Sequence, residues 1–148
     1  MSEPDPLLEA TRRAFETLRA SLSDALWDDE AARIAHARTL ALVGRLDEAT
    51  VTLARGGLPS AIALVHLLGA HGELEAAIAQ GRRAIERFPA HAPGFRNSVA
   101  SMLSALDRHA DALALIEDNL AEEPGVEAWH ELRALLVERL QGDGEEVA

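Results

Sequence analysis

The chain contains no cysteine, no lysine and no tyrosine. The absence of cysteine excludes disulfide bonds and thiolate metal sites. All 14 basic residues are arginine, and together with abundant alanine and glycine this indicates a GC-rich, bacterial genome. Aromatic residues are also scarce, with three Phe and two Trp in 148 residues. The core must therefore be built mainly from alanine and leucine, which have high helix propensity.

The charge is strongly unbalanced, with 25 acidic and 14 basic side chains and a formal net charge of −11. Binding to a phosphate backbone needs a clustered basic surface, but no run of arginines is longer than a pair. We therefore expect no nucleic-acid partner and no anionic membrane surface. The longest mostly apolar run, 57–70, is too short to span a bilayer, and the first ten residues lack the features of a signal peptide. A soluble, cytoplasmic protein is expected.

Helix start and stop signals divide the chain into short segments, without strand-like alternation of useful length. Pro59 and Pro93 stand at first helical positions, and Gly44 and Gly72 stand at turns. The acidic residues 28–30 are interpreted as the start of a helix, where its dipole favours negative charge, and not as a metal site. The expected helices are 6–25, 28–43, 46–55, 59–70, 73–88, 93–106, 109–121 and 126–140, followed by a disordered tail at 141–148.

A short pattern recurs three times along the chain, and such recurrence predicts a repeat architecture. It reads GRLDEAT at 44–50, GELEAAI at 72–78 and DRHADAL at 107–113, each with a turn residue five positions before a small alanine. Pro89 and Pro124 end the second and third copies, 35 residues apart. A helix pair of this size cannot bury its own apolar face, so the pairs must stack.

This pattern resembles the tetratricopeptide repeat family over residues 30–140. The best copy, 64–89, has the turn Gly72, the small Ala77 and the terminal Pro89, while Ala128-Trp129 with Leu132 matches the opening of a further first helix. The resemblance implies an all-α fold of antiparallel helix hairpins, stacked as a short right-handed solenoid of about eight helices with degenerate repeats. The single domain, 1–148, would then comprise an N-terminal helix (1–27), three repeats (28–57, 58–91 and 92–124), a capping helix (125–140) and the tail (141–148).

Two departures from the family pattern predict irregular stacking. The first copy is about six residues short at 56–59, so its second helix is truncated. Gly81 stands where the family prefers a large residue, which predicts either a very close helix approach or a local defect. The helix at 59–70 is apolar nearly all round. That composition favours a central helix buried on two sides over an exposed patch used for binding or dimerisation.

In this family the concave surface, built mostly from first helices, binds peptides or partner helices. The resemblance therefore implies a non-enzymatic protein–protein interaction module, such as an adaptor, a scaffold or a chaperone-like domain. Each position carried over from the family is either a partner contact or an ordinary packing or solvated position. The carried-over partner-binding residues are Ile34, Arg38, Leu42, Ile62, His66, Asn97, Ser101 and Ser104.

Other functions find less support in the sequence. No nucleophile elbow, phosphate loop or dinucleotide-binding motif is present. His66 and His71 lie five residues apart, without the i, i+4 spacing of a helical metal site. We therefore expect no catalytic residue, no metal and no cofactor. The main alternative is a self-associating homodimer, and a third hypothesis is small-ligand binding between helices.

Overall fold

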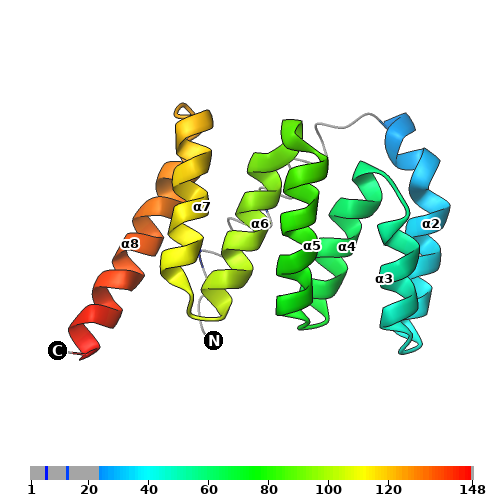
Figure 1. The fold of residues 1–148 in the computed structure, drawn as a ribbon, viewed down its shortest axis with the longest axis horizontal. Helices are drawn as coiled ribbons and strands as arrows, with labels where there is room; N and C mark the ends of the chain where they lie inside the picture. The colour runs from blue at the N-terminus through cyan, green and yellow to red at the C-terminus, as the bar shows by residue number, and fades with distance from the viewer. Residues whose placement is uncertain (1–5, 7–12, 14–23, 148) are drawn as a thin grey trace.

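The computed structural model describes residues 6, 13 and 24–147. Within residues 24–147 the chain forms seven α-helices and a short 3₁₀ helix, without a strand. The helices pack in chain order as adjacent antiparallel pairs, and Figure 1 shows them side by side from α2 to α8. The predicted all-α fold is confirmed. The elements are α2 (Asp24–Leu42), α3 (Leu46–Ala54), α4 (Leu58–Ala70), α5 (Leu74–Arg87), η1 (Pro89–His91), α6 (Ala92–Ala105), α7 (His109–Glu122) and α8 (Glu127–Val147).

The turns inside the three hairpins share one backbone conformation. Gly44, between α2 and α3, has a φ of 82°, and Gly72, between α4 and α5, has a φ of 77°. The third turn places Asp107 at a φ of 60°, a left-handed conformation that Asp tolerates better than most residues. In each turn a backbone N–H bonds to a carbonyl of the first helix, as in a Schellman cap. These bonds join Arg45 to Leu40 (2.8 Å), Glu73 to Leu68 (2.9 Å) and Arg108 to Leu103 (2.8 Å).

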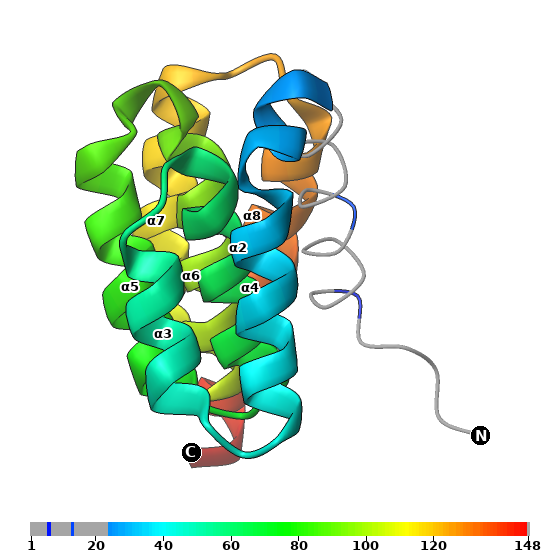
Figure 2. The same ribbon diagram turned by 90° about the vertical axis from the view of Figure 1, so that its right-hand side faces the viewer.

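The hairpins arrange their helices in two layers, which are visible in the end-on view of Figure 2. The first helices α2, α4 and α6 form one layer, and the second helices α3, α5 and α7 form the other. Helix α4 packs against α2, α3, α5 and α6. The prediction that helix 59–70 is a central buried helix is confirmed. The buried residues of α4 are Leu58, Pro59, Ser60, Ala61, Ile62, Leu64, Val65 and Leu68.

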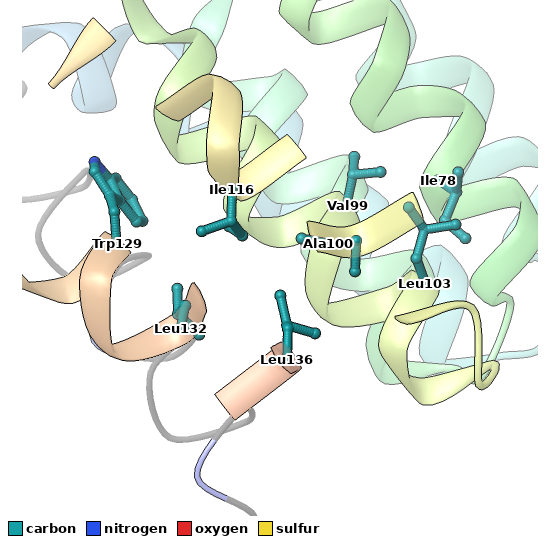
Figure 3. Close-up of a cluster of buried hydrophobic side chains, with 9 residues drawn as sticks. Ile78, Val99, Ala100, Leu103, Ile116, Trp129, Leu132 and Leu136 are labelled. Atoms are coloured by element: carbon teal, nitrogen blue, oxygen red, sulfur yellow. The ribbon is translucent and has the colours of Figure 1, made fainter. Parts of the chain in front are cut away.

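Apolar side chains at the C-terminal end of the array join four successive helices, α5 to α8. Trp129 is buried there, and its Nε1–H donates a hydrogen bond to Glu123 Oε1 at 3.0 Å. Figure 3 shows these side chains converging between the helices. The buried members are Ile78, Val99, Ala100, Leu103, Ala112, Ile116, Trp129, Leu132 and Leu136.

Gly81 lies where α5 and α6 come close together. It is buried, and a Cβ atom at this position would collide with Cγ2 of Val99 on α6. Of the two alternatives that the sequence left open, the structure shows the close helix approach. A larger side chain here would push α5 away from α6.

The structure differs from the sequence-based boundaries at both ends of the described region. Helix α2 already includes residues 24–27, so residues 28–30 lie inside the helix instead of starting it. Helix α8 continues to Val147, where the sequence predicted a disordered tail at 141–148. Extending an existing helix needs no new nucleation, so the two glycines in this tail do not end it. The predicted helix 6–25 lies almost wholly outside the described residues.

Candidate functional site

The eight residues carried over from the repeat family divide into two groups of four. Ile34, Ile62, Asn97 and Ser104 are buried in the structure. Ile34 and Ile62 belong to apolar core clusters in the N-terminal half of the array. These four positions are therefore packing positions in this chain, and their burial argues against direct contact with a partner.

The other four residues lie at the surface of the first-helix layer. Arg38 and His66 are exposed, Leu42 is 84% exposed, and Ser101 is half-buried. Arg38 on α2 and His66 on α4 are close enough to interact electrostatically. Partial burial lowers the pKa of His66, and the nearby positive charge of Arg38 lowers this pKa further. The structure thus brings two predicted site residues together from different hairpins.

The two buried polar residues have different hydrogen-bond environments. Ser104 Oγ lies 2.8 Å from Nδ1 of the buried His109, across the turn between α6 and α7. Asn97 is only 1% exposed, and its Nδ2 has no hydrogen-bond partner among the described residues. An unpaired buried amide costs stability, so Asn97 stands out from an otherwise satisfied interior.

The junction between the first two hairpins holds a cluster that sequence reasoning missed. Glu30 Oε1 on α2 accepts hydrogen bonds from the backbone N–H of Gly57 at 2.5 Å and from Ser60 Oγ at 2.7 Å. Arg87 Nη2 on α5 donates to the carbonyl of Gly56 at 3.1 Å. Glu30 thereby caps the N-terminus of α4 from another helix, where the helix dipole favours a negative charge. The acidic run 28–30 was its only signal in the sequence.

A second polar cluster ties the start of α6 to the end of α7. Asn119 Nδ2 donates to the carbonyl of Pro93 at 2.9 Å, and Arg96 Nη2 donates to Glu122 Oε1 at 2.8 Å. This hydrogen bond raises the pKa of Arg96 and lowers the pKa of Glu122. The cluster holds the third hairpin together, and its geometry suits a structural role.

The first hairpin exposes three large apolar side chains. Leu42 is the last residue of α2, Val43 follows it in the turn, and Val51 lies on α3; they are 84%, 64% and 53% exposed. A contiguous exposed apolar patch is typical of a contact surface, so these side chains are candidates for one. This hairpin also carries Arg38, so apolar and cationic groups lie close together in the chain.

Metal and membrane chemistry find no structural basis among the described residues. No three His, Asp or Glu side chains in this part of the chain lie where they could hold a metal ion together. None of the helices in the same region is both long and apolar enough to cross a lipid bilayer. A comparison with known protein families, curated proteins and solved structures gives no match to this chain.

Proposed function

We propose that this chain is a tetratricopeptide-like, non-enzymatic interaction module that binds a segment of a partner protein on its first-helix face. We define the first-helix face as the outer surface of α2, α4 and α6 around Arg38, Leu42, His66 and Ser101. The observation that carries the proposal is the packing of three similar hairpins in chain order. Because α4 contacts both α2 and α6, equivalent helices form one continuous layer.

The repeat chemistry supports the finer assignment to a short right-handed solenoid of this type. The three hairpin turns share a left-handed residue and an equivalent backbone hydrogen bond. Small residues at equivalent places on the second helices allow close packing within each hairpin, as stacked repeats require. These fully buried alanines are Ala49, Ala77 and Ala112.

The composition of the first-helix face indicates the kind of segment that would fit. Leu42 offers an apolar contact, Arg38 offers a cation and Ser101 offers a hydroxyl group. An apolar anchor beside an acidic side chain would complement this arrangement. Binding energy at such surfaces is concentrated in a few residues, so Arg38 and Leu42 are the ones to test.

Partner capture by the tagged, full-length chain from a lysate of its source organism tests this proposal. The double variant Arg38→Glu, Leu42→Asp should retain roughly tenfold less of the captured partner, since both an ionic and an apolar contact are lost. Arg82→Glu is the matched control, because Arg82 is an exposed arginine on α5 in the opposite layer. Thermal melting would establish that both variants fold. Equal retention by the double variant would show that the first-helix face is not the binding surface.

Self-association is a second candidate because of the exposed side chains of the first hairpin. Leu42, Val43 and Val51 could pair with the same residues of a second copy, as a two-fold interface requires. Light scattering at micromolar concentration distinguishes the two functions. A dimer that Val51→Asp converts to a monomer would support self-association, and a strict monomer would rule it out.

A further inference from the structure

A groove runs between the second helices α3 and α5, in the layer opposite the first-helix face. One part, beside the N-terminal ends of both helices, has a volume of about 640 Å³, and the other, beside their C-terminal ends, has about 320 Å³. Gln80 lines both parts, so they adjoin at this residue, and together they are called here the α3–α5 groove. Its other lining residues are Gly44, Arg45, Leu46, Asp47, Glu48, Thr50, Leu53, Ala54, Ala61, Leu64, Leu68, Glu73, Ala76, Ala79, Arg83, Ala84 and Arg87.

The groove follows from the two sequence irregularities of the repeat. Helix α3 has 9 residues and α5 has 14, because the first copy of the repeat is shortened. Gly81 allows α5 to lie close against α6, on the side of α5 away from α3. At about 100° per residue, Ala76, Ala79 and Arg83 lie on roughly the opposite side of α5 from Gly81. The two alanines are too small to fill the space that faces α3.

The two ends of the α3–α5 groove carry opposite charges. Asp47 and Glu73 line the end beside the helix N-termini and form no ion pair with any described residue, whereas Glu48 pairs there with Arg45. Arg83 and Arg87 line the other end, which has no acidic lining residue, and Arg87 also contacts the Gly56–Gly57 loop where Glu30 is hydrogen-bonded. These two arginines give this end a local positive charge on a chain whose net charge is −11.

The two arginines differ in how firmly they are held. The Arg87 guanidinium donates to the carbonyl of Gly56 and lies 4.8 Å above the centre of the Phe88 ring. Arg83 makes no hydrogen bond or ion pair with any described residue. The helix dipole accounts for Arg87 in the last turn of α5, but it falls off within that turn. Arg83, one turn earlier, is exposed, and its guanidinium is available to a ligand in the groove.

The part of the groove that Arg83 and Arg87 line has an apolar floor. The floor consists of buried side chains from α3, α4 and α5, and the polar groups of this half stand at its rim. Such a surface, with charged ends and an apolar middle, is the counterpart of an amphipathic helix laid into a groove. The floor residues are Leu53, Ala61, Leu64 and Ala84.

We propose that the α3–α5 groove binds an amphipathic helical segment of a partner protein, with acidic residues in its first turn and basic residues in its last turn. The segment would run antiparallel to α3 and α5. Its acidic N-terminal turn would lie against Arg83 and Arg87, and its basic C-terminal turn against Asp47 and Glu73. In this direction the dipole of the bound helix points opposite to the dipoles of α3 and α5, which is the favourable arrangement. The site goes beyond the first-helix face and does not depend on it.

Fluorescence anisotropy with the full chain and three labelled peptides tests this proposal. Each peptide has 12 residues and blocked ends, and all three have the same amino-acid composition. The first has two glutamates in its first turn, two arginines in its last turn and leucine and alanine between them. The second has the same residues in reverse order, and the third has alternating charges. The first should bind roughly tenfold more tightly than the third, a difference of about 1.4 kcal/mol. The second should fall between them, because it can match the charges of the groove only with its dipole parallel to those of α3 and α5.

Variants of the full chain locate the binding. Arg83→Glu should remove the preference for the first peptide, whereas Arg82→Glu, one residue away and outside the groove lining, should keep it. Equal binding of the three peptides, absence of binding, or no effect of Arg83→Glu would overturn the proposal. A different result is that the double variant Arg38→Glu, Leu42→Asp loses peptide binding while Arg83→Glu does not. The peptides would then bind the first-helix face, which would overturn the groove proposal and leave the proposed function standing.

Discussion

At the scale of single residues, Glu30 compensates for the shortened first repeat. The Gly56–Gly57 junction leaves little chain between α3 and α4, and the N-cap position Gly57 has no side chain to cap the helix. Glu30 supplies the missing acceptor from α2, and Arg87 supplies a donor from α5. Three hairpin helices therefore meet at one short loop through charge-assisted hydrogen bonds, which are stronger than neutral ones.

Replacing Glu30 should measurably destabilise the fold. Glu30→Ala removes two hydrogen bonds to a carboxylate and leaves the Gly57 N–H without its acceptor, so we expect a loss of about 2 kcal/mol in the free energy of unfolding. Urea denaturation followed by circular dichroism measures this loss. Asp29→Ala is the matched control, because Asp29 is an exposed neighbour on the same helix. Equal effects of the two substitutions would show that the Glu30 hydrogen bonds contribute nothing specific.

His66 should make the stability of the protein depend on pH. Its pKa in the folded protein lies below the ordinary value of 6.5, so the unfolded chain takes up the proton more readily. The stabilisation is fully present above pH 6.5 and is lost as the pH falls through the folded pKa. Between pH 7.5 and 5.5, wild type should therefore lose more unfolding free energy than His66→Gln. His36→Gln, at an exposed histidine on α2, is the control, and identical pH profiles for wild type and His66→Gln would contradict the prediction.

The candidate site shows what residue spacing can and cannot predict. The carried-over positions share helices at three- or four-residue spacing, yet Ile34 is buried and Arg38, one turn later, is exposed. Spacing defines a face of a helix, but the packing of neighbouring helices decides how much of that face stays open. Asn97 was carried over by its position in the repeat, and the depth at which α6 places it could not be read from the sequence.

At the scale of helices, Gly81 and Val99 form a coupled pair. Gly81→Ala should cost about 1–3 kcal/mol, because the added methyl group collides with Val99 in a packed interior. Val99→Ala makes room for that methyl group, so the double variant should be at least about 1 kcal/mol more stable than the sum of the single effects predicts. Urea denaturation of the four proteins measures the coupling.

Gly142→Ala is the control for this cycle. Gly142 also lies within a helix, but a Cβ atom there would meet no neighbour within 4 Å. This substitution should stabilise the protein slightly, through helix propensity alone. Strict additivity of the Gly81 and Val99 effects would mean that α5 and α6 do not meet at this point.

Helix ends were the best predicted elements, because their signals are local. Pro59 and Pro93 lie in the first turns of α4 and α6, and Gly44 and Gly72 lie at left-handed turns, all as the sequence indicates. The start of α2 was placed too late in the chain, because the acidic run 28–30 was interpreted as a helix start. Those residues lie inside α2, and Glu30 caps a different helix.

At the scale of the whole molecule, the sequence predicted the succession of hairpins but not the groove. Recurring turn and alanine positions are enough to predict antiparallel pairs that pack in order. The α3–α5 groove depends on how far apart two helices lie that do not follow each other in the chain. The two causes of the groove, the short first copy of the repeat and Gly81, were visible in the sequence. Neither of them indicates which two helices would be separated by a groove.

Packing in chain order also has a consequence for how the protein folds. Most contacts join helices that are neighbours in the sequence, so contact order is low and little loop-closure entropy must be overcome, which favours rapid folding. Because one pair cannot bury its own apolar face, we expect each hairpin to be stabilised when it docks on the hairpin that precedes it in the chain. The hydrogen bond from Gly57 to Glu30 spans 27 positions and links two such units. We expect this hydrogen bond to form only after the second hairpin docks on the first. It would then fix the position of the second hairpin along the first.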